Sequence, residues 1–118
     1  MVIDVRQGGI YYHDFGVPFG STPGKKRPVV VVQADSRNRS NLATTIVLPF
    51  TSVLAYGAHA DNVAVPKEVT GLPKDSVIIT FQPTTVDKCE LSDFIGLLPP
   101  EYLQRAIDGV QSSISIPW

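Results

Sequence analysis

Residues 27–33, Arg-Pro-Val-Val-Val-Val-Gln, are the most informative stretch for the fold of this chain of 118 residues. The run Val29–Val32 is its most hydrophobic stretch, and β-branched side chains of this kind favour an extended strand. An apolar run without polar alternation is typical of a strand that is buried on both faces. We therefore expect this segment to be a central strand of a sheet.

The segments on either side repeat this pattern of short apolar runs between turn-forming residues. The expected strands are residues 10–15, 29–33, 43–50, 62–66 and 76–82, with residues 84–88 continuing the last one after Pro83. Pro49 is expected to end its strand or to leave it on an edge of the sheet. Residues 16–26 contain three glycines and two prolines and form a loop. Residues 35–41 form a polar turn with room for a single helical turn.

The C-terminal segment has a helical period. Pro99, Pro100 and Glu101 suit a first helical turn, where a proline lacks only an unused donor and a carboxylate meets the positive end of the dipole. Apolar residues then recur every three or four positions, at Leu103, Ala106, Ile107, Val110 and Ile114. We expect one domain over residues 1–118: mainly β, a strongly bent antiparallel sheet or barrel with one C-terminal helix.

Composition excludes several classes of protein. The single Cys89 cannot form an intramolecular disulfide, and with only two histidines beside it a structural zinc site is not expected. The N-terminus has no apolar signal-peptide region, and the longest apolar run is too short to cross a bilayer. We expect a cytoplasmic protein that does not enter a membrane.

The net charge of −1 argues against a nucleic-acid binder that works through overall basicity, but the charge is unevenly divided. Residues 1–40 carry six Lys and Arg against three Asp, a balance of +3, and residues 41–118 carry four against eight carboxylates, a balance of −4. A nearly neutral chain with a basic first third predicts few phosphate contacts and a shallow salt dependence of any nucleic-acid binding.

Two basic clusters flank the expected central strand, Lys25-Lys26-Arg27 and Arg37-Asn38-Arg39. They are either solvated strand ends or parts of an anion site. A glycine-rich loop beside cations can surround a phosphodiester with backbone N–H groups as well as charges.

Arg27 and Thr51 are the residues best placed for chemistry. If the strands 29–33 and 43–50 pair antiparallel, Arg27 at the start of one lies beside Thr51 at the end of the other. An arginine holds a phosphate and stabilises developing charge, and a threonine hydroxyl can bind a nonbridging oxygen. The pair suits cleavage of RNA in which the 2′-hydroxyl is the nucleophile and no metal is needed. On these two residues alone, a strand-end charge and a turn residue remain the simpler interpretation.

Other catalytic arrangements have little support. His13 in the first strand and His59 in a loop lie near no nucleophile motif, and we interpret both as structural or incidental. The sequence Gly-Ser-Thr-Pro-Gly-Lys-Lys resembles a phosphate-binding P-loop only superficially, because a strand follows it instead of a helix. Asp4, Asp14 and Asp35 are scattered over separate elements, so a carboxylate-bound metal is not expected.

Longer blocks of sequence resemble the MazF/PemK toxin endoribonucleases over nearly the whole chain. The residues that carry the resemblance are GSTPGKKRPVVVVQAD (20–35), NRS (38–40), IVLPFTS (46–52) and TGLPKDSVIITFQPTTVDKCELSDFIGLLPPEYL (70–103). The resemblance implies a compact SH3-like β-barrel with a C-terminal helix, as in the MazF, PemK and CcdB toxins, and a homodimer. It further implies a sequence-selective endoribonuclease for single-stranded RNA that uses no metal or cofactor, leaves a 2′,3′-cyclic phosphate and a 5′-hydroxyl, arrests growth and is neutralised by a cognate antitoxin.

The resemblance also assigns roles to residues. Arg27 matches the family's catalytic arginine and Thr51 its catalytic threonine, while Ser21 and Gln82 match residues near the bound RNA. With the basic clusters and exposed rings, the expected RNA-binding set is Phe19, Ser21, Lys25, Lys26, Arg39 and Gln82, and Tyr56 and Phe81 are further candidates for stacking on bases.

The chain departs from the family pattern in two places. Gln7-Gly8-Gly9-Ile10 stands where relatives have Arg-Gly-Asp followed by Ile or Val, and Phe81-Gln82-Pro83 where many have Glu-Gln. These changes bear on the RNA sequence preference more than on the reaction.

Two other functions remain open at this level. The first is a CcdB-type toxin that binds gyrase without catalysis, for which the C-terminal Trp118 is the relevant feature, although a ring packed on the protein surface explains that residue equally simply. The second is a non-catalytic interaction module on the same barrel. Intact Arg27 and Thr51 argue against the second.

Overall fold

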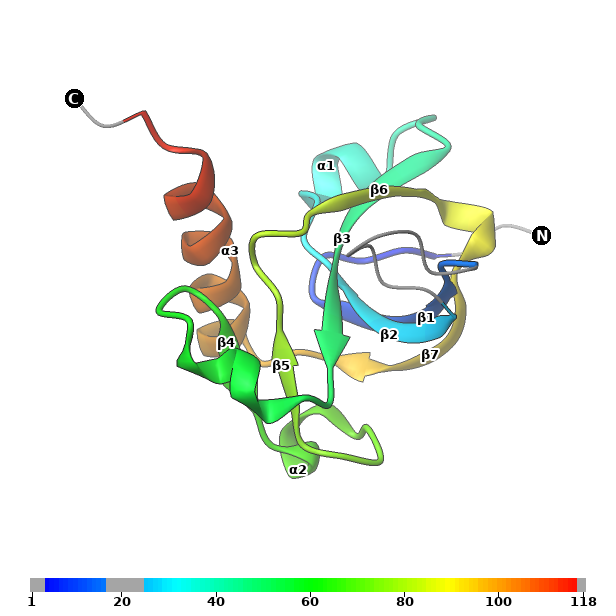
Figure 1. Cartoon of the computed structure of the whole chain (residues 1–118). Helices are drawn as coiled ribbons and strands as arrows, with labels where there is room; N and C mark the ends of the chain where they lie inside the picture. Colours follow the sequence, from blue (N-terminus) through cyan, green and yellow to red (C-terminus); the bar gives the residue numbers. More distant parts are fainter. Residues whose placement is uncertain (1–3, 17–24, 117–118) are drawn as a thin grey trace.

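The computed structural model describes residues 4–16 and 25–116, which form a curled antiparallel sheet with a helix along one side (Figure 1). The strands are β1 (Gly9–Asp14), β2 (Lys26–Val31), β3 (Thr44–Thr51), β4 (Val63–Val65), β5 (Ser76–Ile78), β6 (Thr84–Asp87) and β7 (Ser92–Leu97). The helices are α1 (Asp35–Asn38), α2 (Lys67–Thr70) and α3 (Pro100–Ile114), with single 3₁₀ turns η1 (Leu54–Ala58) and η2 (Lys88–Glu90). No helix in this part of the chain is long and apolar enough to span a membrane.

The strand β2 lies in the middle of the sheet, as its sequence predicts. The strand order is β4-β5-β3-β2-β1-β7, and β6 pairs with β3 beside this path. Val29, Val30 and Val31 are fully buried, and they alternate between two apolar cores on opposite faces of the strand. Burial on both faces explains why the run contains no polar residue.

Each face of the sheet has its own core. One core, around Ile10, Val30, Leu48 and Phe50, continues into Ala106 of α3. The other, around Tyr11, Val29, Val47 and Val86, fills the concave side of the curled strands (Figure 1). The predicted fold class, mainly β with a strongly bent antiparallel sheet or SH3-like barrel and one C-terminal helix, is confirmed, and the strands form a half-barrel.

The expectation for Pro49 is wrong. Pro49 is buried inside β3, opposite Val29 of β2. Its carbonyl accepts a hydrogen bond from the Ile79 N–H at 3.0 Å, so its nitrogen also faces the β5 and β6 side. On that side, β6 pairs with β3 only as far as Val47, and β5 pairs with β3 only from Phe50 onward. Pro49 lies between the two partners, so its missing N–H removes no hydrogen bond between strands.

Strand boundaries differ from the expectation elsewhere. The strand β7, antiparallel to β1, was not expected, because Asp93 at a φ of 54° and Gly96 interrupt its apolar pattern. The strand β5 ends at Ile78 instead of residue 82. Beyond it, the Thr80 hydroxyl donates to the Asp61 carbonyl at 3.0 Å, which ties the chain to the loop before β4.

The helix α3 begins at the predicted prolines, but its apolar stripe packs only in part. Ala106 and Gly109 are buried, whereas Ile114 is 71% exposed. A Cβ atom placed on Gly109 would lie 2.5 Å from the Asp61 carbonyl oxygen and 2.8 Å from Thr80 Cγ2. The glycine therefore permits the close contact between α3 and the sheet.

Gly109→Ala is expected to destabilise the protein even though alanine favours helices. The intrinsic gain of about 1 kcal/mol is outweighed by an overpacking cost of about 1–3 kcal/mol, because one obstructing atom belongs to the backbone. Thermal or urea unfolding measures the difference. Gly96→Ala is the matched control, since nothing among the described residues lies within 4 Å of its Cβ position. Equal or greater stability of Gly109→Ala would show that α3 moves away without cost.

Candidate active site

Arg27 and Thr51 lie at the adjoining ends of two central strands. The strands β2 and β3 are antiparallel, with Val29 opposite Pro49, and two residues further along each strand come Arg27 and Thr51. Arg27 is two residues from Val29 on β2, and Thr51 is four residues from Val47 on β3, so each lies on the same face of its strand as that valine. Because Val29 and Val47 both belong to the concave core, the side chains of Arg27 and Thr51 leave the same face of the sheet. The expectation that the two residues share one edge of the sheet is confirmed.

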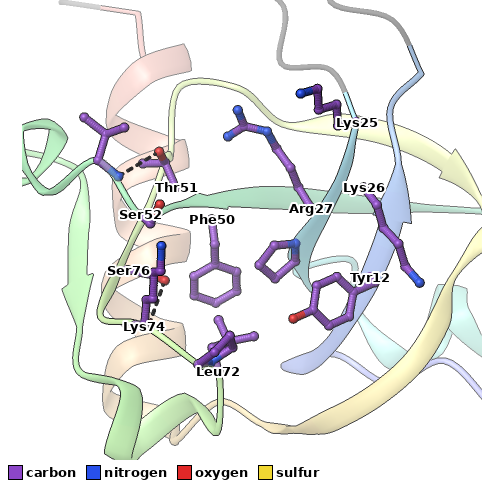
Figure 2. Close-up of a pocket in the computed structure, with 13 residues that line it drawn as sticks. Tyr12, Lys25, Lys26, Arg27, Phe50, Thr51, Ser52, Leu72, Lys74 and Ser76 are labelled. Atoms are coloured by element: carbon purple, nitrogen blue, oxygen red, sulfur yellow. Dashed lines mark hydrogen bonds between the residues drawn. The ribbon is translucent and has the colours of Figure 1, made fainter.

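A cavity of about 340 Å³ opens at this edge (Figure 2). Its apolar wall consists of Tyr12, Pro28, Phe50 and Leu72. Figure 2 shows Tyr12, Phe50 and Leu72 on one side of the strands, with the Arg27 guanidinium and the Thr51 hydroxyl on the other side. The rest of the lining is Lys25, Lys26, Ser52, Val53, Pro73, Lys74 and Ser76.

The charge of this cavity is positive. Lys25, Lys26, Arg27 and Lys74 line it, and no carboxylate is among the lining residues that the structure describes. Lys26 points outward, where its Nζ lies 3.0 Å from the Asp93 carboxylate and 5.5 Å from the centre of the Tyr12 ring. The exposed Asp93 carboxylate offsets part of the Lys26 charge, and the cationic lining suits a phosphate group.

Thr51 is held by its own turn. Its Oγ1 accepts a hydrogen bond from the Val53 N–H at 3.2 Å, which fixes the side chain at the rim of the cavity. The hydroxyl keeps its hydrogen for donation to a second group. This geometry allows Thr51 to donate to a nonbridging phosphate oxygen beside the Arg27 guanidinium.

Two predicted RNA-binding residues lie elsewhere. Arg39 follows α1, beyond the other end of β2, and lines a separate hollow with Asp87 and Lys88. The two basic clusters therefore do not form one anion site, because the length of β2 separates them. Gln82 lies between β5 and β6, half-buried, and its Oε1 has no hydrogen-bond partner among the described residues.

The stacking candidates form a small cluster of rings apart from the cavity lining. The ring centres of Tyr56 and His59 are 6.2 Å apart, and those of His59 and Phe81 are 5.8 Å apart. Phe19, Ser21 and Trp118 lie outside the described residues, and their predicted roles stay predictions.

Tyr12, Ser52 and Lys74 are polar lining residues that the sequence interpretation does not single out. Tyr12 is two strands from Thr51 in the sheet order, and Lys74 comes from the connection between α2 and β5. Ser52 directly follows Thr51. Ser52 and Lys74 both lie within the blocks that resemble the toxin family, and this resemblance is the feature of the sequence that could have pointed to them. Within residues 4–16 and 25–116, no group of three His, Cys, Asp or Glu side chains could hold a metal ion.

Two groups with shifted pKa values lie outside the cavity, where they fix the N-terminal segment. The Gln7 N–H donates to the Asp35 carboxylate at 2.8 Å and lowers the pKa of that group. Burial raises the pKa of Tyr11, whose hydroxyl donates to the Asp4 carbonyl at 3.2 Å. Both groups stabilise the fold and lie away from Arg27.

Known proteins resemble the chain in sequence and in structure. The family model described as PemK-like, MazF-like toxin of type II toxin–antitoxin system matches residues 6–114. Endoribonuclease MazF6 of Mycobacterium tuberculosis is 37% identical over 112 residues, which cover 95% of this chain and 98% of the relative. Endoribonuclease EndoA of Bacillus subtilis is 32% identical over 112 residues, covering 95% and 96% of the two chains.

The solved structures agree with the fold. A crystal structure of MazF from Deinococcus radiodurans has a TM-score of 0.80 at 16% identity and covers 98% of this chain and all of its own. A mycobacterial endoribonuclease in complex with its cognate antitoxin has a TM-score of 0.74 at 20% identity, with 99% of both chains covered. The sequence matches favour an enzyme over the two non-catalytic alternatives, and the chain belongs to the PemK-like, MazF-like toxins of type II toxin–antitoxin systems as an endoribonuclease.

Proposed function

We propose that this endoribonuclease cleaves single-stranded RNA by attack of a ribose 2′-hydroxyl on the adjacent phosphate. The products are a 2′,3′-cyclic phosphate and a 5′-hydroxyl. The observation that carries the proposal is the position of Arg27 beside Thr51 at the rim of a cavity lined by cations. The substrate supplies its own nucleophile, so the protein has to hold the phosphate and stabilise the charge that develops on it.

Each residue has a distinct role in this reaction. The Arg27 guanidinium binds the nonbridging oxygens and remains charged throughout, because an arginine does not lose its proton in a protein. The Thr51 hydroxyl donates to one of these oxygens. Lys25 and Lys74 attract the flanking phosphates, and the half-buried Tyr12 ring offers a surface beside which a base can pack.

The proposed partners follow from the family. A relative of this fold is described as bound to its cognate antitoxin, and we propose an antitoxin for this chain as well. An acidic and apolar antitoxin segment over the basic cavity would exclude RNA. We further propose a homodimer that acts in the cytoplasm, shows sequence selectivity and arrests growth when the antitoxin is absent.

Cleavage of a defined transcript tests the reaction. Purified protein with single-stranded RNA in EDTA is expected to give discrete fragments whose 5′ ends accept phosphate from a polynucleotide kinase without prior phosphatase treatment. The matched control is the same RNA with a 2′-O-methyl group at one mapped cleavage site. That site alone is expected to become resistant. Cleavage at the methylated position, or fragments with 5′-phosphate ends, would contradict attack by the 2′-hydroxyl.

A further inference from the structure

The proposed reaction needs a proton acceptor that Arg27 and Thr51 do not provide. The 2′-hydroxyl must lose its proton as its oxygen bonds to phosphorus. A guanidinium has no lone pair available for that proton, and a threonine hydroxyl is a very weak base near neutral pH. No carboxylate is among the described residues that line the cavity.

His13 lies in the same row of the sheet as these two residues. In the antiparallel pairing of β1 and β2, His13 is directly opposite Arg27. Side chains of directly opposed residues leave the same face of a sheet, with Cβ atoms roughly 5 Å apart. His13, Arg27 and Thr51 therefore form one row across β1, β2 and β3, on the face opposite to Tyr12, Pro28 and Phe50.

The environment of His13 is unusual for a purely structural residue. The residue is 7% exposed, close to the 5% of Thr51, whereas Arg27 is half-buried. Its Nδ1 is buried and has no hydrogen-bond partner among the described residues. The ring meets Phe15 edge-on, with centres 4.6 Å apart. A buried nitrogen without a partner is rare in folded proteins and is compatible with a role that is fulfilled only when substrate is bound.

Other bases near the site are placed less well. Asp14 alternates to the opposite face of β1, and its Oδ1 already accepts the Gly16 N–H at 2.8 Å. Neither histidine is among the described residues that line the cavity. His13 adjoins it through its place opposite Arg27, whereas His59 lies in the ring cluster with Tyr56 and Phe81.

We propose that His13 is a third catalytic residue, the proton acceptor for the 2′-hydroxyl. This inference rests on the proposed function. As the bond between O2′ and phosphorus forms, Nδ1 takes the 2′ proton, and the bond between phosphorus and O5′ breaks with its electron pair on O5′. A water molecule then protonates O5′, and the imidazolium returns its proton to solvent, so that protons and charge balance.

Substitution of His13 separates this role from packing. His13→Phe keeps a ring against Phe15 but has no nitrogen, and it is expected to lower kcat by about 10²-fold or more with little change in KM. The melting temperature is expected to stay close to that of the wild type. His59→Phe, the same change at the other histidine, is the matched control and should leave kcat unchanged.

Chemical rescue is a readout that a packing role would not affect. The charged groups around the ring are Arg27 opposite it on β2, Asp14 next to it on β1, and Lys25, whose carbonyl accepts the Phe15 N–H. Added imidazole should restore part of the rate of His13→Ala and none of the rate of Arg27→Ala.

The outcomes distinguish the two proposals. A wild-type protein that does not cut RNA, or an Arg27→Ala variant that cuts normally, overturns the proposed function. A wild-type protein that cuts, together with a His13→Phe variant that cuts at the same rate, overturns only the role of His13. If the phenylalanine variant does not fold, the alanine variant decides: retained rate, or lost rate without rescue by imidazole, overturns the role.

Discussion

Arg27→Ala is expected to reduce the single-turnover rate of RNA cleavage by about 10²–10³-fold, the effect of removing one charge-stabilising group from a transition state. The loss corresponds to about 3–4 kcal/mol of barrier. It arises because the nonbridging oxygens gain negative charge as the phosphorus becomes five-coordinate. Lys25 and Lys74 remain in the cavity lining, but an ammonium does not replace the two-pronged contact of a guanidinium.

The matched control for this experiment is Arg105→Ala. Arg105 is exposed on α3 and packs over the Tyr102 ring, with 5.6 Å between its Cζ and the ring centre. The substitution removes the same charge and leaves the cavity intact, so the rate should not change. An equal loss in both variants would indicate that net charge matters, and undiminished cleavage by Arg27→Ala would contradict the assigned role.

Phe50→Ala is expected to lower the free energy of unfolding by about 3–5 kcal/mol, the range for truncating a buried phenylalanine. Phe50 is 1% exposed and is the largest fully buried side chain of the described residues. A domain of this kind has about 5–15 kcal/mol of stability in total, so the variant should unfold at a much lower urea concentration. Equilibrium denaturation by urea measures the shift of the midpoint.

Phe94→Ala is the control for this second substitution. Phe94 lies on β7, is 56% exposed and touches the Tyr11 ring at 5.3 Å between centres. Its truncation should shift the midpoint much less, because little of the ring leaves water on folding. Similar losses in the two variants would mean that β7 carries as much of the stability as the core between the sheet and α3.

Phe50 and Thr51 connect the fold to the site. They are adjacent in β3, so one side chain enters the core and the other reaches the rim beside Arg27. A shift of β3 by one residue would exchange them, turning the hydroxyl toward the core and the ring toward the rim. The burial of Phe50 therefore also fixes the position of Thr51.

The limits of prediction are visible in particular residues. The valine run predicts a central strand because its apolar side chains need burial on both faces, and Arg27 and Thr51 follow from antiparallel pairing of two neighbouring strands. Charge alone suggests Arg39 as an RNA-binding residue together with the cluster around Arg27, but the length of β2 separates the two arginines and Arg39 lines a different hollow. The position of Pro49 depends on where β6 stops and β5 begins, which its neighbours in the sequence do not encode.

The central strand, the start of α3 and the pair Arg27 and Thr51 could all be predicted from local sequence, because periodicity and pairing of adjacent strands act over short stretches of chain. The register that sets His13 opposite Arg27 and the closing of the cavity by Tyr12, Leu72 and Lys74 became visible only in the folded protein. Tyr12 lies on β1, and Leu72 and Lys74 lie between α2 and β5, so the curl of the sheet has to bring these segments together. That curl depends on how its two cores pack, and no local pattern in the chain specifies it.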